Sequence, residues 1–237
     1  MIDIHTHILP HMDDGAADPE MSLAMLRADA EQQLDTVILT PHFYRRNEKP
    51  ESFLDRRRKS YDTLCEAIAA LPQEERNALP KLHLGAEVAW LPGLVMVEHL
   101  PQLCLADTDF MLIELPFLPW SGKMIDQLYD LQNVCGITPV IAHFERYLTF
   151  QKKEYVWRIL EMDVPVQIGT DPLLHFFGKK EPLRLLREGA AQIVASDCHN
   201  LTGRAPNLGA AMEAIRQKFG RNFAEQVAQN PYEILFD

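Results

Sequence analysis

The sequence predicts an α/β fold in which parallel strands close into a distorted seven-stranded (β/α)7 barrel. Apolar, β-prone segments alternate with helical segments along the whole chain, an order that favours parallel strands joined by crossover helices. Seven such strand segments occur within 237 residues, a length that suits one domain spanning 1–237. Side chains that bind metals follow most of these segments, as expected at the mouth of a barrel.

The seven predicted strands are short and rich in β-branched and aliphatic residues. They cover Ile2–Ile4, Thr36–Thr40, Leu82–Ala86, Phe110–Leu115, Thr138–Ala142, Val164–Ile168 and Gln192–Ala195. Seven strand and helix units in a single domain favour a barrel over an open sheet.

The predicted helices have recognisable start and stop residues. Asp18 and Pro19 form the cap and first turn of the first helix, and a Pro or Gly ends each of the other four. The helices cover Glu20–Gln33, Ser52–Leu71, Lys123–Cys135, Pro182–Glu188 and Asn207–Phe219.

Composition excludes several classes of protein. The formal net charge of −11 disfavours binding to nucleic acid or to an anionic membrane. No apolar run is long enough for a membrane span, and the N-terminus lacks a signal pattern, so we expect a cytoplasmic protein. The cationic run Arg56–Lys59 lies in a helical pattern and is predicted to be a solvated face.

The first strand runs into an His-x-His pair, His5 and His7. Residues two apart in a strand point to the same side, so both imidazoles can bind one ion. Taken alone, such a pair is more often one buried and one surface histidine than a metal site, because short motifs match by chance.

The other metal-capable residues decide between these interpretations. They follow successive predicted strands or lie at strand ends, which meet at one face of a barrel. The candidate ligands are five imidazoles and four carboxylates, namely His5, His7, Asp14, His42, Glu87, Glu114, His143, Asp197 and His199. Nine ligands exceed the needs of one ion, which favours two or three ions that share carboxylates.

Longer motifs then resemble a known family. The segments are Ile-Asp-Ile-His-Thr-His, Asp-Asp-Gly, Thr-Pro-His, Gly-Ala-Glu, Leu-Ile-Glu, Thr-Pro-Val-Ile-Ala-His-Phe-Glu-Arg-Tyr, Phe-Gly-Lys-Lys and Ala-Ser-Asp-x-His-Asn-Leu-x-Gly-Arg. They resemble the polymerase and histidinol phosphatase (PHP) superfamily, and within it the manganese-dependent tyrosine-protein phosphatases of bacterial capsule and exopolysaccharide operons. The resemblance covers nearly the whole chain.

The resemblance implies an assignment of ligands to ions. One ion would be held by His5, His7, Glu87 and Asp197, a second by Glu87, Glu114 and His143, and a third by Asp14, His42 and His199. The ions would most commonly be Mn²⁺, with Zn²⁺, Fe²⁺ or Mg²⁺ as alternatives. The resemblance also implies that Arg146 and Arg204 bind the substrate phosphate, a task that suits the guanidinium fork.

The implied chemistry needs no protein nucleophile. A hydroxide activated by the metals would attack phosphorus in line while the ions and both arginines neutralise charge on the oxygens. His11, Tyr147 and Asp171 are loop residues that could supply a proton to the leaving group, and the sequence does not choose among them. The implied partner is a phosphotyrosine protein, the tyrosine-rich tail of a bacterial tyrosine kinase.

Other functions remain open at this point. Cys198 and Arg204 satisfy C-x5-R, the spacing of cysteine-dependent phosphatases, but neighbouring ligands already occupy that loop. A metal-dependent amidohydrolase also begins with His-x-His, although it usually closes eight strands. Histidinol phosphate or another small phosphoester would use much the same ligands. A metal-stabilised interaction module would be expected to lack ligands, and none is missing.

Two stretches of the sequence do not decide which residues line the substrate site. Residues 167–172 read Gln-Ile-Gly-Thr-Asp-Pro, where the family often has an Asn-Ala-Ser type sequence. The loop after His42 carries Tyr44, Arg45 and Arg46, which either contact a phosphotyrosine peptide or are ordinary surface residues.

Overall fold

The structure is a computed structural model that describes residues 1–174 and 180–236. All of its strand pairs are parallel, which confirms the predicted α/β class. The strands are β1 Ile2–Thr6, β2 Thr36–Leu39, β3 His42–Phe43, β4 Lys81–Leu84, β5 Glu87–Ala89, β6 Phe110–Glu114, β7 Thr138–Ile141, β8 Gln167–Gly169 and β9 Ile193–Ala195.

The predicted closed seven-stranded barrel is not found in the described residues. The strands form three sheets with the orders β1-β2-β4, β3-β5-β6-β7 and β8-β9. Isolated bridges link Thr6 to Cys198 and Ile141 to Val166, so the sheets adjoin without one continuous ladder. One physical reason is Pro41, which follows β2 and has no N–H to continue the ladder into β3. The short strands β3 and β5 lie just beyond the predicted strands Thr36–Thr40 and Leu82–Ala86 and were not predicted.

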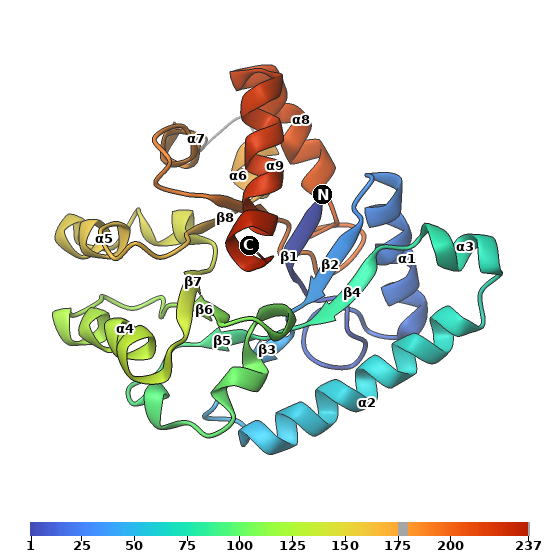
Figure 1. The fold of residues 1–237 in the computed structure, drawn as a ribbon, viewed down its shortest axis with the longest axis horizontal. Helices are drawn as coiled ribbons and strands as arrows, with labels where there is room; N and C mark the ends of the chain where they lie inside the picture. The colour runs from blue at the N-terminus through green and yellow to red at the C-terminus, as the bar shows by residue number, and fades with distance from the viewer. Residues whose placement is uncertain (175–179, 237) are drawn as a thin grey trace.

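The strands nevertheless curve around one small core. Side chains that alternate along β1, β2, β6, β7 and β9 meet there, among them Ile4, Ile38 and Val140. Leu235 of helix α9, Arg221–Phe236, packs into the same cluster beside Ile2 at the start of β1. Figure 1 accordingly shows α9 in front of the strands. This helix covers the amino-terminal ends of the strands and leaves the carboxyl ends for the loops.

The helices pack outside the strands (Figure 1). They are α1 Pro19–Glu31, α2 Pro50–Ala69, α3 Gln73–Ala78, α4 Gly122–Cys135, α5 Lys153–Leu160, α6 Asp171–Leu174, α7 Lys180–Arg187, α8 Leu208–Phe219 and α9, with 3₁₀ turns η1 Leu94–Met96, η2 Leu100–Leu103, η3 Leu105–Asp107 and η4 Phe144–Tyr147. All five predicted helices are confirmed within a few residues, and α1 begins as expected because Asp18 accepts a hydrogen bond from the Met21 N–H at 2.8 Å. The sequence prediction missed α3, α5, α6 and α9.

The cationic run on α2 is only partly a solvated face. Arg56, Arg58 and Lys59 are exposed, but Arg57 is 8% exposed. Its guanidinium donates to the carbonyls of Gly85 at 2.6 Å and Gln102 at 2.8 Å, so it joins α2 to the loop after β4 and to η2. The expectation was therefore wrong for Arg57, because a guanidinium can be buried when its donors are satisfied.

The remaining expectations concern a membrane span and the motif Phe-Gly-Lys-Lys. None of the helices in the described ranges is long and apolar enough to cross a membrane. The motif Phe-Gly-Lys-Lys occupies residues 177–180, and residues 177–179 lie outside the described residues.

Candidate metal centre

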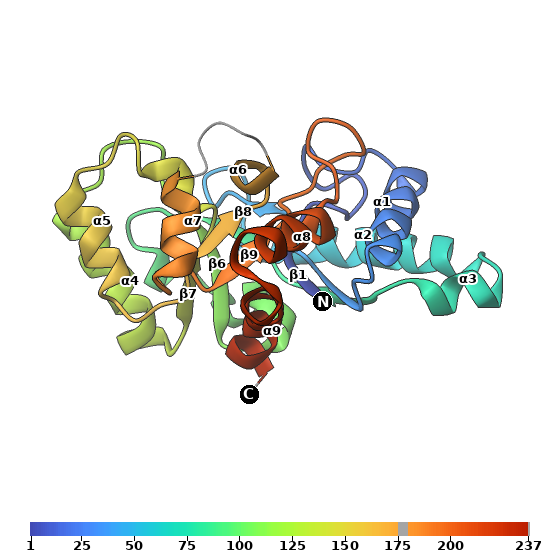
Figure 2. The same cartoon turned by 90° about the horizontal axis from the view of Figure 1, so that it is seen from above.

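The nine candidate ligands all lie at one face of the strands. They come from β1 and its following loop (His5, His7, Asp14), the first residues of β3 and β5 (His42, Glu87), the last residue of β6 (Glu114) and the loops after β7 and β9 (His143, Asp197, His199). Figure 2 shows the loops after β1 and β9 side by side, on the side of the molecule away from the C-terminus. The structure thus brings together residues separated by almost the whole length of the chain.

The innermost group consists of His5, His7, Glu87 and Asp197, and all four are buried. His5 Nε2 lies 3.2 Å from His7 Nε2 and 3.3 Å from both Glu87 Oε2 and Asp197 Oδ1. His7 Nε2 lies 3.3 Å and 3.4 Å from the same two oxygens. Two imidazole nitrogens and two carboxylate oxygens therefore face one point, an arrangement suited to a first-row divalent ion.

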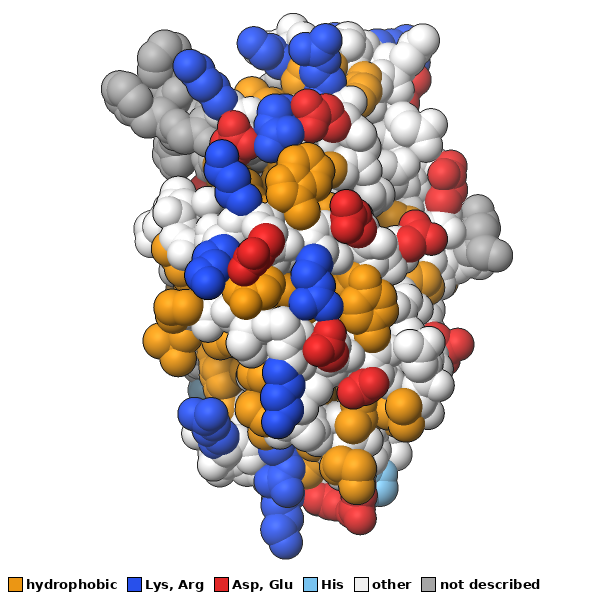
Figure 3. Space-filling model, turned by 90° about the vertical axis from the view of Figure 1, so that its left-hand side faces the viewer, with side chains coloured by type: hydrophobic (Ala, Val, Ile, Leu, Met, Phe, Trp, Pro, Cys, Tyr) orange, Lys and Arg blue, Asp and Glu red, His pale blue; other side chains and the backbone are white. Residues whose placement is uncertain are grey.

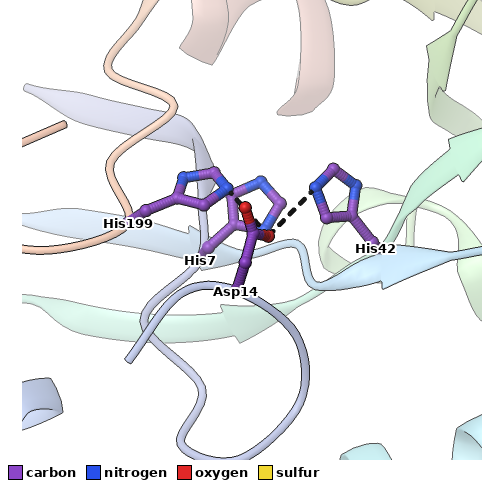
Figure 4. A group of neighbouring side chains, drawn as sticks. All are labelled: His7, Asp14, His42 and His199. Carbon is purple, nitrogen blue, oxygen red and sulfur yellow. Dashed lines mark ion pairs between the residues drawn. The ribbon is translucent and has the colours of Figure 1, made fainter. Parts of the chain in front are cut away.

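A second group contains His7, Asp14, His42 and His199. Figure 4 shows Asp14 rising between the imidazoles of His42 and His199. Its Oδ1 lies 3.5 Å from His42 Nε2 and 3.4 Å from His199 Nε2. The Asp14 side chain is 66% exposed, so this group forms the outer edge of the site.

Glu87 lies between the groups. Its Oε2 is 2.8 Å from His42 Nδ1, and its Oε1 is 3.0 Å from His143 Nε2. Glu114 Oε1 lies 3.5 Å from the same nitrogen of His143. The third geometric group is His42, Glu87 and Glu114, so His42 faces both the outer and the central groups. This differs from the expected set of Glu87, Glu114 and His143, although His143 touches both carboxylates.

Several buried polar atoms of these residues have no hydrogen-bond partner among the described residues. They are His42 Nδ1, Glu87 Oε2, His143 Nδ1, Asp197 Oδ1 and His199 Nε2. Buried polar atoms are rarely left without a partner, because desolvation is then uncompensated. Atoms that point at one another without hydrogen-bond geometry fit a set of metal ligands, so the residues present suit the divalent ions implied by the resemblance.

The electrostatics keep the carboxylates ionised. Burial would raise the pKa of Glu87, but His5, His143 and His42 hold that pKa well below its usual value. Burial also opposes ionisation of Asp197, and the charge of His5 and the contact with His7 again lower its pKa. Metal ligands must be deprotonated, so both carboxylates are ready to bind at neutral pH.

The imidazoles of His199 and His143 have pKa values shifted in opposite directions. Burial and the nearby charge of His7 lower the pKa of His199 to about 4, so this ring is neutral at pH 7. Burial alone would lower the pKa of His143, but hydrogen bonds to Glu114 and Glu87 raise it to about 9. An ion that binds His143 must therefore displace a proton, and the affinity for metal is expected to rise with pH.

Unusual backbone conformations place two of the ligands. His143 has φ 32° and Asp197 has φ 54°, both in the left-handed region that non-glycine residues rarely adopt. Gly15 is needed for a different reason, since a Cβ on it would lie 2.1 Å from the His7 carbonyl oxygen. The Asp-Asp-Gly turn can therefore fold back onto His7 and bring Asp14 to the site.

Both candidate phosphate-binding arginines contact Asp197. Arg146 Nη2 donates to Asp197 Oδ2 at 2.6 Å, and Arg204 Nη2 donates to the same oxygen at 2.7 Å. The other carboxylate oxygen, Oδ1, faces His5 and His7. One side chain thus joins the innermost ligand group to both guanidinium groups, which border a cavity of about 250 Å³ next to it.

The C-x5-R motif does not form a thiolate site. Cys198 is fully buried, and burial raises the pKa of its thiol well above the ordinary value. A nucleophilic cysteine needs an accessible thiolate with a lowered pKa. Arg204, the arginine of this motif, is engaged with Asp197 instead.

Comparisons with known proteins identify the family of this chain. The sequence profile of the family described as "Capsular polysaccharide synthesis, CpsB/CapC" matches residues 1–236. The chain belongs to the CpsB/CapC family. It is 33% identical to tyrosine-protein phosphatase YwqE of Bacillus subtilis over 99% of this chain and 91% of that protein. It is 31% identical to tyrosine-protein phosphatase CpsB of Streptococcus pneumoniae over 100% of this chain and 99% of that protein.

A solved structure of the CpsB/CapC type has the same fold. It comes from work described as "Crystal structures of YwqE from Bacillus subtilis and CpsB from Streptococcus pneumoniae, unique metal-dependent tyrosine phosphatases". The superposition has a TM-score of 0.83 at 30% identity and covers 99% of this chain and 94% of that one.

Two residues, Asp13 and Gln167, support candidate ligands of this CpsB/CapC member and were not predicted from the sequence. Asp13 Oδ2 contacts His7 Nδ1 at 2.8 Å and accepts the His42 N–H at 2.9 Å. Gln167 Oε1 accepts the His143 N–H at 2.7 Å and lies 3.3 Å from His5 Nδ1. The position of Asp13 shortly after the His-x-His pair was a usable signal, since a carboxylate that contacts a ligand histidine orients its imidazole toward the metal. Gln167, in the segment 167–172 that departs from the family pattern, thus supports both His143 and His5.

Replacing Asp13 by Asn should weaken metal binding by about 10- to 100-fold, the usual cost of removing such a support. The charge of His7 lowers the pKa of Asp13 despite burial, so the carboxylate is ionised and fixes the orientation of the ring. The measurement is metal content after dialysis against graded free Mn²⁺. Asp18→Asn, on an exposed cap, is the matched control. Unchanged metal affinity in the Asp13 variant would contradict this role.

Proposed function

We propose that this chain is a metal-dependent protein-tyrosine phosphatase that hydrolyses phosphotyrosine in a partner protein of capsular or exopolysaccharide synthesis. The proposed partner is the tyrosine-rich tail of a bacterial tyrosine kinase. Support comes from relatives named tyrosine-protein phosphatases and from the described match to a capsular polysaccharide synthesis family.

One observation carries the proposal. Asp197 directs Oδ1 at His5 and His7 and holds both Arg146 and Arg204 through Oδ2. A site that places two guanidinium forks beside a cluster of metal ligands is suited to a phosphate dianion, because bidentate arginine contacts fit phosphate oxygens.

The nine ligands support two or three divalent ions, and we propose Mn²⁺. The ligand atoms are imidazole nitrogens and carboxylate oxygens, without a thiolate, and this combination suits Mn²⁺, Fe²⁺ and Zn²⁺. The proposed first ion uses His5, His7, Glu87 and Asp197. The proposed outer ion uses Asp14, His42 and His199, with Glu114 and His143 completing the ligands around Glu87.

Bound divalent ions supply Lewis acidity and lower the pKa of water at the site. The protein's own residues bind and orient the phosphate. Arg146 and Arg204 orient the phosphate oxygens and neutralise the charge that develops on them. Asp197 keeps the two guanidinium groups on the same side of the ligand cluster.

The three residues considered as proton donors occupy different environments. Asp171 lines the cavity beside Arg146 and Arg204. The Tyr147 hydroxyl accepts a hydrogen bond from the Leu115 N–H at 3.0 Å, and burial raises its pKa well above the usual value, so it serves packing. His11 and Asp171 are both exposed, but His11, in the loop after β1, does not line this cavity. We therefore propose Asp171 as the donor to the leaving phenolate.

The test is release of phosphate from a phosphotyrosine peptide and from histidinol phosphate by metal-stripped protein, with Mn²⁺, Zn²⁺ or Mg²⁺ added back. Peptide turnover should require metal and should survive thiol alkylation. Cys198→Ser should retain normal turnover, because the buried thiol has no place in the reaction.

Each alternative predicts a different result. Turnover of histidinol phosphate alone would show a small-molecule phosphoesterase with the same ligands. Loss of activity on alkylation and in Cys198→Ser would favour the thiolate mechanism. Absence of turnover on both substrates at full metal occupancy would overturn the proposed function.

A further inference from the structure

Two neighbouring hollows lie at the loops after β3, β5 and β6, and the inner one borders the metal centre. The inner hollow, of about 470 Å³, is lined in part by Tyr44, Trp90, Glu114, Phe117 and Leu118. The outer hollow, of about 540 Å³, is lined in part by Lys49, Met96 and Val97. Arg45 and Leu91 line both, so the two hollows are neighbours. We call the pair the flanking groove.

The flanking groove is continuous with the metal centre. Glu114, at its inner end, lies 3.5 Å from the candidate ligand His143. The Tyr44 ring stacks on His42 with 5.2 Å between centroids, and the Phe117 ring stacks on His143 at 5.9 Å. A chain whose phosphotyrosine reaches the metal centre therefore passes between two aromatic side chains into the groove.

The walls of the inner hollow are apolar and exposed. Phe117 is 50% exposed and Leu118 is 69% exposed, and each is next to a proline in the segment 116–119. Aromatic and aliphatic side chains that gather at a concave surface mark a binding site when the pocket also carries a few polar groups.

The charged groups of the inner hollow are Arg45, Arg46 and, at the end next to the metal centre, Glu114. Arg45 and Arg46 both line the inner hollow, and neither guanidinium has a carboxylate oxygen within 4.0 Å in residues 1–174 and 180–236. The outer hollow differs, because Lys49 is there accompanied by Glu51 and Glu98. The chain as a whole carries a net charge of −11, so an acidic ligand finds favourable potential only at such local cations.

We propose that the flanking groove binds the peptide segment next to the phosphotyrosine. An apolar or aromatic side chain of that segment packs on Trp90 and Leu118, and an acidic side chain pairs with Arg45 and Arg46. This inference rests on the proposed function and adds a preference for sequence around the phosphorylated residue. An extended peptide advances about 3.3 Å per residue, so residues close in sequence to the phosphotyrosine reach the inner hollow first.

Exposed apolar side chains elsewhere lack this setting. Figure 3 shows the side of the molecule that carries α4, α5 and α7, where apolar side chains alternate with Lys, Arg and acidic ones. Val134 on α4 is 71% exposed and is not among the residues that line the flanking groove. It offers a control surface of similar apolar character.

The experiment compares three substrates on the metal-loaded full chain. They are p-nitrophenyl phosphate, a phosphotyrosine peptide with Phe and Glu beside the phosphotyrosine, and a peptide of equal length with Gly and Ser in their places. We expect kcat/KM for the first peptide to exceed that for the second by about tenfold, as one well-formed charged contact provides.

The variants are Arg46→Glu and Leu118→Ser, both at exposed positions. Each should lower the ratio of kcat/KM between the two peptides by at least about threefold, and the double variant should bring it near one. The matched controls are Arg58→Glu on α2 and Val134→Ser on α4, which should keep the ratio. Turnover of p-nitrophenyl phosphate should be unchanged in all of them, because it has no flanking residues.

The outcomes separate the groove from the proposed function. Equal turnover of both peptides by the wild type, or an unchanged ratio in both variants, would overturn the groove while phosphatase activity stands. If no substrate is hydrolysed, the proposed function fails, and binding of the Phe and Glu peptide by fluorescence anisotropy decides the groove. Weaker binding by Arg46→Glu and Leu118→Ser than by the controls supports it, and equal binding overturns it.

Discussion

Replacing Glu87 by Gln should lower kcat/KM for a phosphotyrosine peptide by about 10³-fold or more. The side chain is 1% exposed and its two oxygens contact four imidazoles, those of His5, His7, His42 and His143. A neutral amide keeps the shape but loses the charge that the proposed ions would share. Metal ions contribute several kcal/mol of stabilisation to the transition state, and about 4 kcal/mol corresponds to 10³-fold.

The prediction is checked by kinetics together with metal content measured by elemental analysis. Glu114→Gln is the informative comparison, because Glu114 contacts His143 at 3.5 Å and is 17% exposed, so its loss should be smaller. Glu213→Gln, on the exposed surface of α8, should have full activity. A Glu87 variant that keeps both full metal content and more than about a tenth of wild-type kcat/KM would contradict a bridging role.

The sequence predicted the site better than the architecture around it. His5 and His7 share one side of a strand because of the two-residue period, which is a local property. His42 and Glu87 come soon after the ends of β2 and β4 and pair in register at the starts of β3 and β5, and His143 follows β7, so parallel strands bring the three together. Both inferences need only the identity and order of the strands, and neither depends on closure of a barrel.

The continuity of the sheet could not be predicted in the same way. Closure depends on the register between strands and on local breaks, such as the one at Pro41 and the shifted register between Asp3 and Thr6 of β1. These are set by packing across the molecule. Helix α9 was missed for a related reason, because Gly220 ends α8 and Pro231 lies within α9, where its ring normally disfavours a helix.

Charge in the sequence was also a poor guide to exposure at single positions. Arg57 and its neighbour Arg58 have the same side chain, yet Arg57 is buried against two carbonyl groups. Only the crossing of α2 over the loop at Gly85 makes those acceptors available. Asp13 and Asp14 are similarly adjacent, and the turn at Gly15 sends one to His7 and the other to the outer edge of the site.

Replacing Arg146 or Arg204 by Lys should lower kcat/KM by about 10²-fold, and replacement by Ala by about 10³-fold. Removing one preorganised donor at a developing anion has effects of this size. Lysine does not restore the function because an ammonium group lacks the planar fork that binds two phosphate oxygens while also donating to Asp197. Metal content at saturating Mn²⁺ should stay at the wild-type level, since neither guanidinium is a candidate ligand.

Inhibition by inorganic phosphate gives a second measurement. Phosphate should inhibit the arginine variants less strongly, because the same contacts hold the product. Arg158→Lys is the matched control, since Arg158 pairs with Asp126 at 2.7 Å on the surface between α5 and α4. Wild-type kcat/KM together with wild-type phosphate inhibition in Arg146→Lys and Arg204→Lys would remove both arginines from the phosphate site.

The double variant tests the role of Asp197 as the common anchor. Arg146 and Arg204 donate to the same oxygen, at 2.6 Å and 2.7 Å, so the loss of one leaves the other with an altered partner. Neighbouring groups that act together give non-additive effects. The loss in Arg146→Ala/Arg204→Ala should therefore be smaller than the product of the two single losses. Full additivity would mean that each arginine is positioned independently, and the shared oxygen of Asp197 would then have no part in aligning them.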